Sequence, residues 1–184
     1  PVRHLAKDGG LMAVIEAIET VYLEVDSITS VAFTSIPATY EHLQLRISSR
    51  DLYGTTYDWI FLRFNSDSGT NYSSHAMEGY SSSTNGVEET GKTYARLGVA
   101  VGSHANVPTA TYSTNVIDIL DYANTNKNTT MMGLGGNALG AQSVRPSSAL
   151  WGDTDAVNRI DVYVLYTAAW ERGTEMTLYG LKSA

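Results

Sequence analysis

The stretch WIFLRFNSDSGTNYSSH at residues 59–75 decides the fold class, because it contains a strand, a polar turn and the start of a second strand. Its first residues alternate in a period of two, so that Ile60, Leu62 and Phe64 share one face of a strand. Asn and Asp side chains in the next segment can bond the local backbone, as they do in turns. We therefore expect a structural hairpin turn formed by Asn65, Asp67, Gly69, Asn71 and Tyr72.

The same alternation recurs along the chain, for example in LQLRI at 43–47, VIDIL at 116–120 and MTLYGL at 176–181. Turn-forming clusters rich in Gly, Asn, Asp and Ser separate these runs. The pattern predicts an all-β fold, an antiparallel β-sandwich that is jelly-roll-like and has about nine or ten strands. Residues 12–25 are expected to be mostly strand, with a short helix as the alternative, and residues 81–93 to form one long exposed loop. The candidate segments are 14–25, 28–34, 41–49, 58–66, 71–79, 94–101, 112–121, 129–135, 143–151, 158–166 and 174–182.

The length of 184 residues predicts one domain, a single β-sandwich over residues 12–184. Residues 1–11, PVRHLAKDGGL, read as an N-terminal arm, because no strand pattern begins before Met12. Two explanations of the arm stay open. It is an incomplete, processed or artificially added terminus, or it becomes ordered on a neighbouring subunit.

Charge and composition exclude several classes of partner. The net charge is −7 and the basic residues are scattered, which argues against nucleic acid as a partner. No apolar run approaches the roughly 20 residues that cross a bilayer, so no membrane partner is expected. The chain has no Cys, which excludes disulfides and Cys-zinc sites.

The sequence contains no pattern that is specific for chemistry. The 65–71 segment resembles half of a calcium loop, but it lacks the closing Glu, and a turn explains it better. The His residues are dispersed, and no nucleophile motif occurs. Acidic residues such as Asp51 and Asp58 could line a sugar-cleaving cleft, but their spacing selects no pair. We expect a protein that is not an enzyme, with no catalytic residues, no metal and no cofactor.

Two further groups of residues are candidates for a role. A structural corner is predicted at Ile36, Pro37 and Tyr40, where proline ends one strand and tyrosine packs under the next. Exposed Tyr and Trp side chains are typical of subunit contacts and of sugar-ring stacking. The candidate contacts with a partner or a glycan are Trp59, Tyr80, Trp151 and Trp170.

Five segments in order resemble a family of small virion structural proteins of tailed phages. They are FTSIPATYEHLQLR at 33–46, LRFNSDSGTNYSSH at 62–75, VIDILDYANTNKNTT at 116–130, SALWGDTDAVNRIDVYV at 148–164 and TLYGLK at 177–182. The resemblance implies a non-enzymatic protein on the exterior of the virion, assembled in the host cytoplasm. Its expected role is capsid decoration, and the alternative is a carbohydrate-binding, receptor-binding domain of a tail fibre or spike.

The same resemblance implies the partners. They are other copies of the chain, with a closed trimer as the default oligomer, together with phage capsid or tail proteins. A glycan of the host surface is the partner that the alternative role requires.

Overall fold

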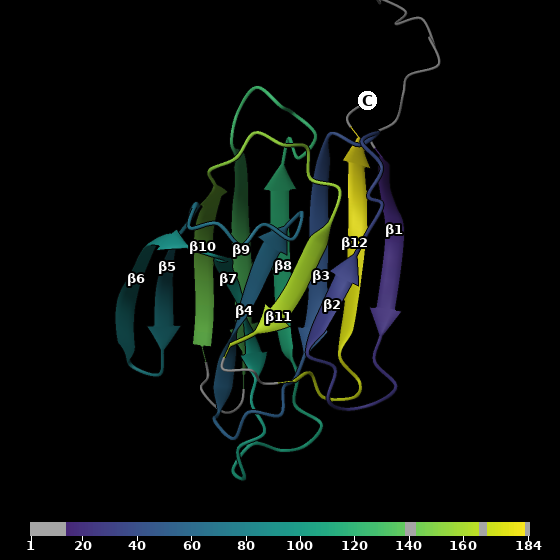
Figure 1. The fold of residues 1–184 in the computed structure, drawn as a ribbon. Coiled ribbons are helices and arrows are strands. Elements are labelled where there is room, and N and C mark those ends of the chain that lie inside the picture. The colour runs from purple at the N-terminus through teal and green to yellow at the C-terminus, as the bar shows by residue number, and fades with distance from the viewer. Residues whose placement is uncertain (1–13, 139–142, 166–168, 183–184) are drawn as a thin grey trace, which may run out of the picture.

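The computed structural model describes residues 14–138, 143–165 and 169–182, and these residues form only strands, turns and loops (Figure 1). The arm predicted for residues 1–11 lies outside the described residues. Because the described residues contain no helix, none of them forms a helix that could span a membrane. The strands are β1 (Val14–Tyr22), β2 (Ser30–Phe33), β3 (His42–Ser49), β4 (Tyr57–Phe64), β5 (Tyr72–Tyr80), β6 (Ser83–Lys92), β7 (Ala95–Val101), β8 (Ser113–Leu120), β9 (Thr129–Asn137), β10 (Ser143–Trp151), β11 (Ile160–Val164) and β12 (Glu175–Lys182).

The strands form two antiparallel sheets that pack face to face. The larger sheet has eight strands in the order β1-β12-β3-β8-β9-β10-β5-β6, and the smaller sheet has four in the order β2-β11-β4-β7. In Figure 1 the smaller sheet lies across the front of the larger one. The predicted all-β sandwich is confirmed, although the described residues form 12 strands where about nine or ten were expected.

The pairing of the strands is nested, which makes the sandwich a jelly roll. With β5, β6, β9 and β10 set aside, eight strands remain, and the first of them pairs with the last, β1 with β12. The next pairs inward are β2 with β11, β3 with β8 and β4 with β7. Successive pairs alternate between the two sheets, as in a ribbon wound around a barrel. The jelly-roll-like prediction therefore describes the topology.

Two hairpins are inserted into the jelly roll and extend the larger sheet. The pair β5 and β6 follows β4, the pair β9 and β10 follows β8, and the two hairpins join because β10 pairs with β5. The long loop predicted for residues 81–93 is wrong, since β6 occupies most of it. Its sequence STNGVEETGK has Val87 as its one aliphatic side chain, so it carries no period-two signal.

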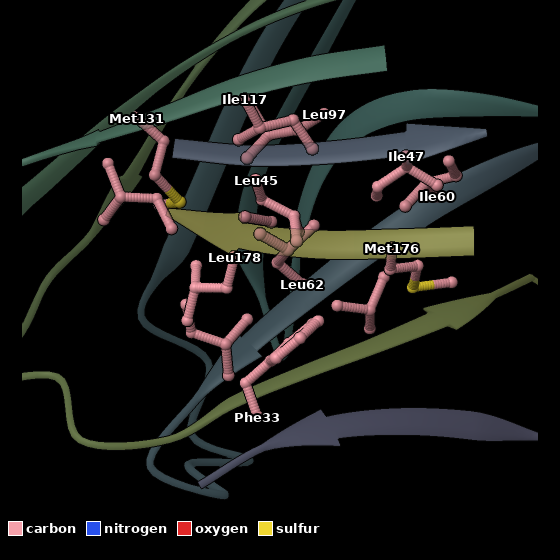
Figure 2. Packing of buried hydrophobic residues seen from close by; sticks show 14 of the residues in the cluster. Phe33, Leu45, Ile47, Ile60, Leu62, Leu97, Ile117, Met131, Met176 and Leu178 are labelled. Atoms are coloured by element: carbon pink, nitrogen blue, oxygen red, sulfur yellow. The ribbon is translucent and has the colours of Figure 1, made fainter. Parts of the chain in front are cut away.

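The core lies between the sheets and follows the predicted alternation. On β3, Leu43 and Leu45 are fully buried, and so are Leu62 and Phe64 on β4. Figure 2 shows side chains from β3, β4, β8 and β12 interdigitating with Phe33 of β2. Because both sheets direct one face inward, alternate residues of each strand are removed from water and packed against apolar neighbours. This burial stabilises the fold by about 25 cal/mol per Å² of apolar surface.

Strand β7, at the edge of the smaller sheet, is fixed to the larger sheet by side chains. The Asn115 amide accepts a hydrogen bond from the Val99 nitrogen and donates one to the Val99 oxygen, each 2.9 Å long. The Ser147 hydroxyl donates to the Leu97 oxygen at 3.0 Å. A Cβ on Gly133 would collide with that same carbonyl, so glycine permits this close approach. Polar side chains of the larger sheet thus satisfy backbone groups of an edge strand.

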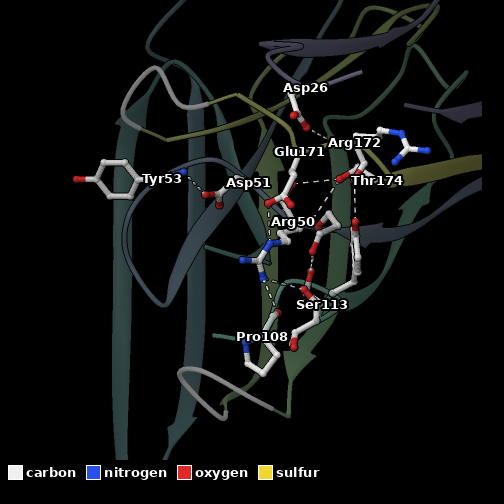
Figure 3. Close-up of polar contacts among 12 residues, drawn as sticks. Asp26, Arg50, Asp51, Tyr53, Pro108, Ser113, Glu171, Arg172 and Thr174 are labelled. Carbon is white, nitrogen blue, oxygen red and sulfur yellow. Dashed lines mark hydrogen bonds and ion pairs between the residues drawn. The ribbon is translucent and has the colours of Figure 1, made fainter. Parts of the chain in front are cut away.

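A second polar cluster fastens the loops at one end of the sandwich (Figure 3). The buried Arg50 guanidinium donates to Glu171 at 2.6 Å and to the Pro108 carbonyl at 3.1 Å. The Thr174 hydroxyl donates to the Arg50 carbonyl at 3.1 Å. The loops before β8 and β12 are therefore held to the end of β3. The buried Arg50 guanidinium thus has a structural role in joining these loops.

Candidate functional site

The predicted turn between β4 and β5 is organised around the carboxylate of Asp67. One carboxylate oxygen accepts a hydrogen bond from the Gly69 nitrogen at 2.7 Å. The other accepts from the Trp151 indole at 2.7 Å and from the Asn71 amide at 2.9 Å. These donors, the indole first, hold the pKa of Asp67 below its usual value. Protein donors already engage both oxygens, which favours the hairpin interpretation over a calcium ligand.

The remaining turn residues tie this corner to neighbouring segments. The Asn65 side chain donates to the Ala156 carbonyl at 3.0 Å and accepts from the Asn158 nitrogen at 2.9 Å. The Tyr72 hydroxyl accepts from the Phe64 nitrogen at 3.0 Å, and its ring stacks on Trp151 with centroids 6.3 Å apart. All five predicted turn residues therefore lie together, and their importance for stability stays a prediction.

The predicted corner at Ile36, Pro37 and Tyr40 lies over the end of β12. Ile36 is buried, and the Pro37 carbonyl accepts a hydrogen bond from the Tyr122 hydroxyl. The Tyr40 ring lies against Gly180, where any Cβ would collide with it, and the Tyr40 hydroxyl donates to Glu16 at 2.9 Å. This arrangement joins the segment before β3 to β1 and β12.

Two of the four predicted contact aromatics must be corrected. Trp151 is 1% exposed and Trp170 is fully buried, so neither presents a surface to a partner or a glycan. Both indoles belong to the hydrophobic core. Tyr80 is 45% exposed at the end of β5, and Trp59 is half-buried.

The Trp59 ring is covered by two arginines. The Arg145 guanidinium lies 3.6 Å from the ring centroid and the Arg96 guanidinium 4.3 Å from it. Arg145 points inward from β10, is 1% exposed, and forms an ion pair with the buried Glu78 at 3.2 Å. Burial lowers the pKa of Arg145. These charges stack on Trp59 within the fold, so the indole serves packing at this edge of the sandwich.

Part of the extension of the larger sheet reverses the usual polarity of a sandwich. Its inner face carries the Glu78 and Arg145 pair, whereas apolar side chains point outward. We call the apolar group the outer patch, and it comprises Met77, Met132, Leu134, Val144 and Pro146 on β5, β9 and β10.

The outer patch is continuous and its five residues are uncharged, with Asp118 of β8 opposite Met132 at its border. Leu134 stands opposite Pro146 in the β9–β10 register, and Val144 stands opposite Gly79 of β5. Met132 is 61% exposed and Leu134 is 55% exposed. In soluble proteins, contiguous exposed apolar surfaces are typical of interaction sites. Sequence reasoning missed it, because Met132 and Leu134 form the more apolar of the two alternating faces of MMGLGG, as core residues would.

Asp51 and Asp58, two of the carboxylates that sequence analysis considered for acid/base chemistry, lie inside the fold. Burial raises the pKa of Asp51 to about 7 and that of Asp58 to about 6. Asp51 is fully buried and Asp58 is 2% exposed, so a substrate cannot reach either in this conformation. Within residues 14–138, 143–165 and 169–182, no three His, Asp or Glu side chains gather as a metal site would require. His42 instead accepts a hydrogen bond from the Asp121 nitrogen at 3.0 Å.

The outer face of the smaller sheet carries an aromatic hollow of about 530 Å³. We call it the small-sheet hollow, and it is lined among others by Ser30, Phe61, Arg63, Tyr94, Asp161 and Tyr163. None of these residues was selected as a site residue from the sequence, because the apolar and polar residues of their strands alternate as they do in the other strands of the chain.

Comparison of the chain with protein-family models, with curated proteins and with solved structures found no match. The fold and the two surfaces therefore carry the functional argument together with the sequence resemblance.

Proposed function

We propose that the protein is a structural component of a bacteriophage virion, located on the particle exterior, where it acts as a capsid decoration protein. The observation that carries the proposal is the outer patch. A sheet face that exposes Met132, Leu134 and Val144 to water gains no hydrophobic stabilisation from these side chains. A subunit that covers this face by association recovers that benefit, which suits a building block of an assembly.

We propose that a second copy of this chain covers the outer patch. Each copy has a net charge of −7, so copies repel one another over most of their surface. The patch contains no charged residue, and Pro146 lies on β10, the central one of its three strands. Two such faces can meet with their apolar side chains interdigitated, as the two sheets of a sandwich do.

Three other observations support the proposal. The jelly roll is an architecture of viral capsid proteins, although lectins share it and a fold alone does not fix a function. The five ordered segments that resemble phage virion proteins include the β4–β5 turn and the corner before β3. The buried carboxylates and the stacked arginines are used within the fold, which suits a structural role.

Immunogold labelling of intact phage particles tests the location. Antibodies against the purified protein are expected to label the head surface. Labelling confined to the tail would replace decoration by the fibre or spike role. Particles that are labelled only after disruption, or that lack the protein altogether, would overturn an exterior location.

Sedimentation velocity tests the association surface. The change Leu134→Asp places a carboxylate in the outer patch and is expected to convert the oligomer to a monomer. The matched control Ser48→Asp adds the same charge to an exposed position of β3 on the same sheet and should leave the oligomer intact. A wild-type protein that is monomeric, or an oligomer that withstands Leu134→Asp, would refute self-association through this face.

A further inference from the structure

The small-sheet hollow has the size and composition of a ligand site. Its volume of about 530 Å³ lies within the usual range for small-molecule pockets. It opens on the outer face of the smaller sheet, whereas the outer patch lies on the outer face of the larger sheet. A ligand in the hollow therefore does not compete with association through the patch.

Three aromatic rings form the apolar part of the hollow. Phe61 is fully buried beneath it, with its ring centroid 4.2 Å from that of Tyr94 and 5.8 Å from that of Tyr163. The three rings are tilted rather than parallel, by 55° and 36°. Burial raises the pKa of Tyr163 to about 12, in keeping with the buried position of its hydroxyl oxygen. Such an aromatic surface accepts the C–H face of a sugar ring.

The charges in the hollow favour an acidic ligand. The Arg63 guanidinium lies 5.4 Å from the Tyr163 centroid and donates from Nε to the Thr93 carbonyl at 3.1 Å. Among the described residues, no carboxylate forms an ion pair with Arg63. Asp161 is instead bound by Arg159, with contacts of 2.6–3.0 Å. Within the part of the chain that the structure describes, the Arg63 guanidinium thus forms no ion pair, and its charge acts at longer range on Asp67. This positive charge lies in a protein whose net charge is −7.

We propose that the small-sheet hollow binds one ring of an acidic saccharide, with the sugar on the aromatic rings and its carboxylate on Arg63. A guanidinium binds a carboxylate through two parallel hydrogen bonds, which a neutral sugar cannot form. Ser30 and the Asp161 carboxylate lie at the same hollow and can bond the sugar hydroxyls. The inference goes beyond capsid decoration, and it does not depend on where the protein lies in the particle.

Saturation-transfer NMR and calorimetry on the purified full chain test the proposal, with glucuronic acid as the probe and glucose as its neutral counterpart. Glucuronic acid is expected to bind with a Kd of about 1 mM, and glucose at least about tenfold more weakly. The change Arg63→Gln should weaken binding of glucuronic acid by about tenfold and leave the weak binding of glucose unchanged. Raising the salt concentration should also weaken binding of the acid.

The control variant is Arg46→Gln. Arg46 lies 4.9 Å from the Tyr179 ring on the larger sheet, so the variant removes an equivalent arginine–tyrosine pair outside the hollow. It should bind glucuronic acid like the wild type. Equal affinity for the acid and glucose, equal losses in both arginine variants, or no binding of glucuronic acid would overturn the proposal. Immunogold labelling of particles tests the virion assignment separately. The saccharide-binding proposal and the virion proposal can therefore fail independently of each other.

Discussion

The hydrogen bonds from Asn115 to β7 yield the sharpest test of the fold. The change Asn115→Ala removes both partners of the Val99 backbone, whose nitrogen and oxygen are buried at the edge of the smaller sheet. Each unsatisfied buried group costs about 1–3 kcal/mol, so the two together should lower the free energy of unfolding by about 2–6 kcal/mol. A domain of this kind has about 5–15 kcal/mol in total, so the loss is a large fraction of its stability.

Urea unfolding followed by tryptophan fluorescence measures this loss. The control Asn85→Ala removes an exposed amide from β6 and should change the free energy of unfolding by less than about 0.5 kcal/mol. The change Asn115→Asp should destabilise at neutral pH as well, because it replaces the donor to the Val99 carbonyl by a charged oxygen. If Asn115→Ala unfolds like the control, side chains of the larger sheet do not hold the edge strand, and the reasoning is refuted.

Three other predictions concern the corners and the buried acids. The change Asp67→Ala leaves the Trp151 indole without its acceptor and should cost about 1–3 kcal/mol in urea unfolding, and a cost near zero would contradict the assigned role of the carboxylate. The double change Pro37→Ala and Tyr40→Ala should clearly lower the Tm, whereas an unchanged melt would remove the corner from the stabilising elements. The raised pKa of Asp51 means that the folded state binds a proton more tightly than the unfolded state between about pH 4 and pH 7. The contribution of Asp51 to the free energy of unfolding therefore falls as the pH rises through that window. The change Asp51→Asn removes the titrating group and should flatten the profile of Tm against pH from 5 to 8. An unaltered slope would argue against a titrating Asp51.

The sequence was sufficient to predict the layers of this fold, but not all of its strands. Strands β3 and β4 were visible because each places one face in the core, so that Leu45 and Leu62 fall at regular intervals. Strand β6 lies at the edge of the sheet extension, with Gly and Thr where apolar residues would mark a face. Its pairing with β5 supplies the order that its own residues do not signal.

The candidate sites depended on contacts between distant segments, which local patterns do not contain. Asn65, Asp67 and their neighbours could be grouped in advance because a turn is local. Trp151 and Trp170 were wrongly predicted to be exposed. In a sequence, a tryptophan beside polar residues has the same local pattern whether it lies at the surface or at the edge of the core. Arg63 gains its significance from ring neighbours on β11 and before β7, which only the tertiary structure brings together.

The nested pairing also determines how the domain bears tension. Val14 begins β1 opposite Lys182, which ends β12, so a pull applied between these residues separates two neighbouring strands from their shared end. Ladder bonds of an antiparallel pair are perpendicular to the strands, so that pull loads them one after another, and the pair unzips at low force. A subunit gripped through the broad face of β9 and β10 would distribute the same pull over many bonds at once. The mechanical strength of the proposed assembly would then depend on which of these two attachments carries the load.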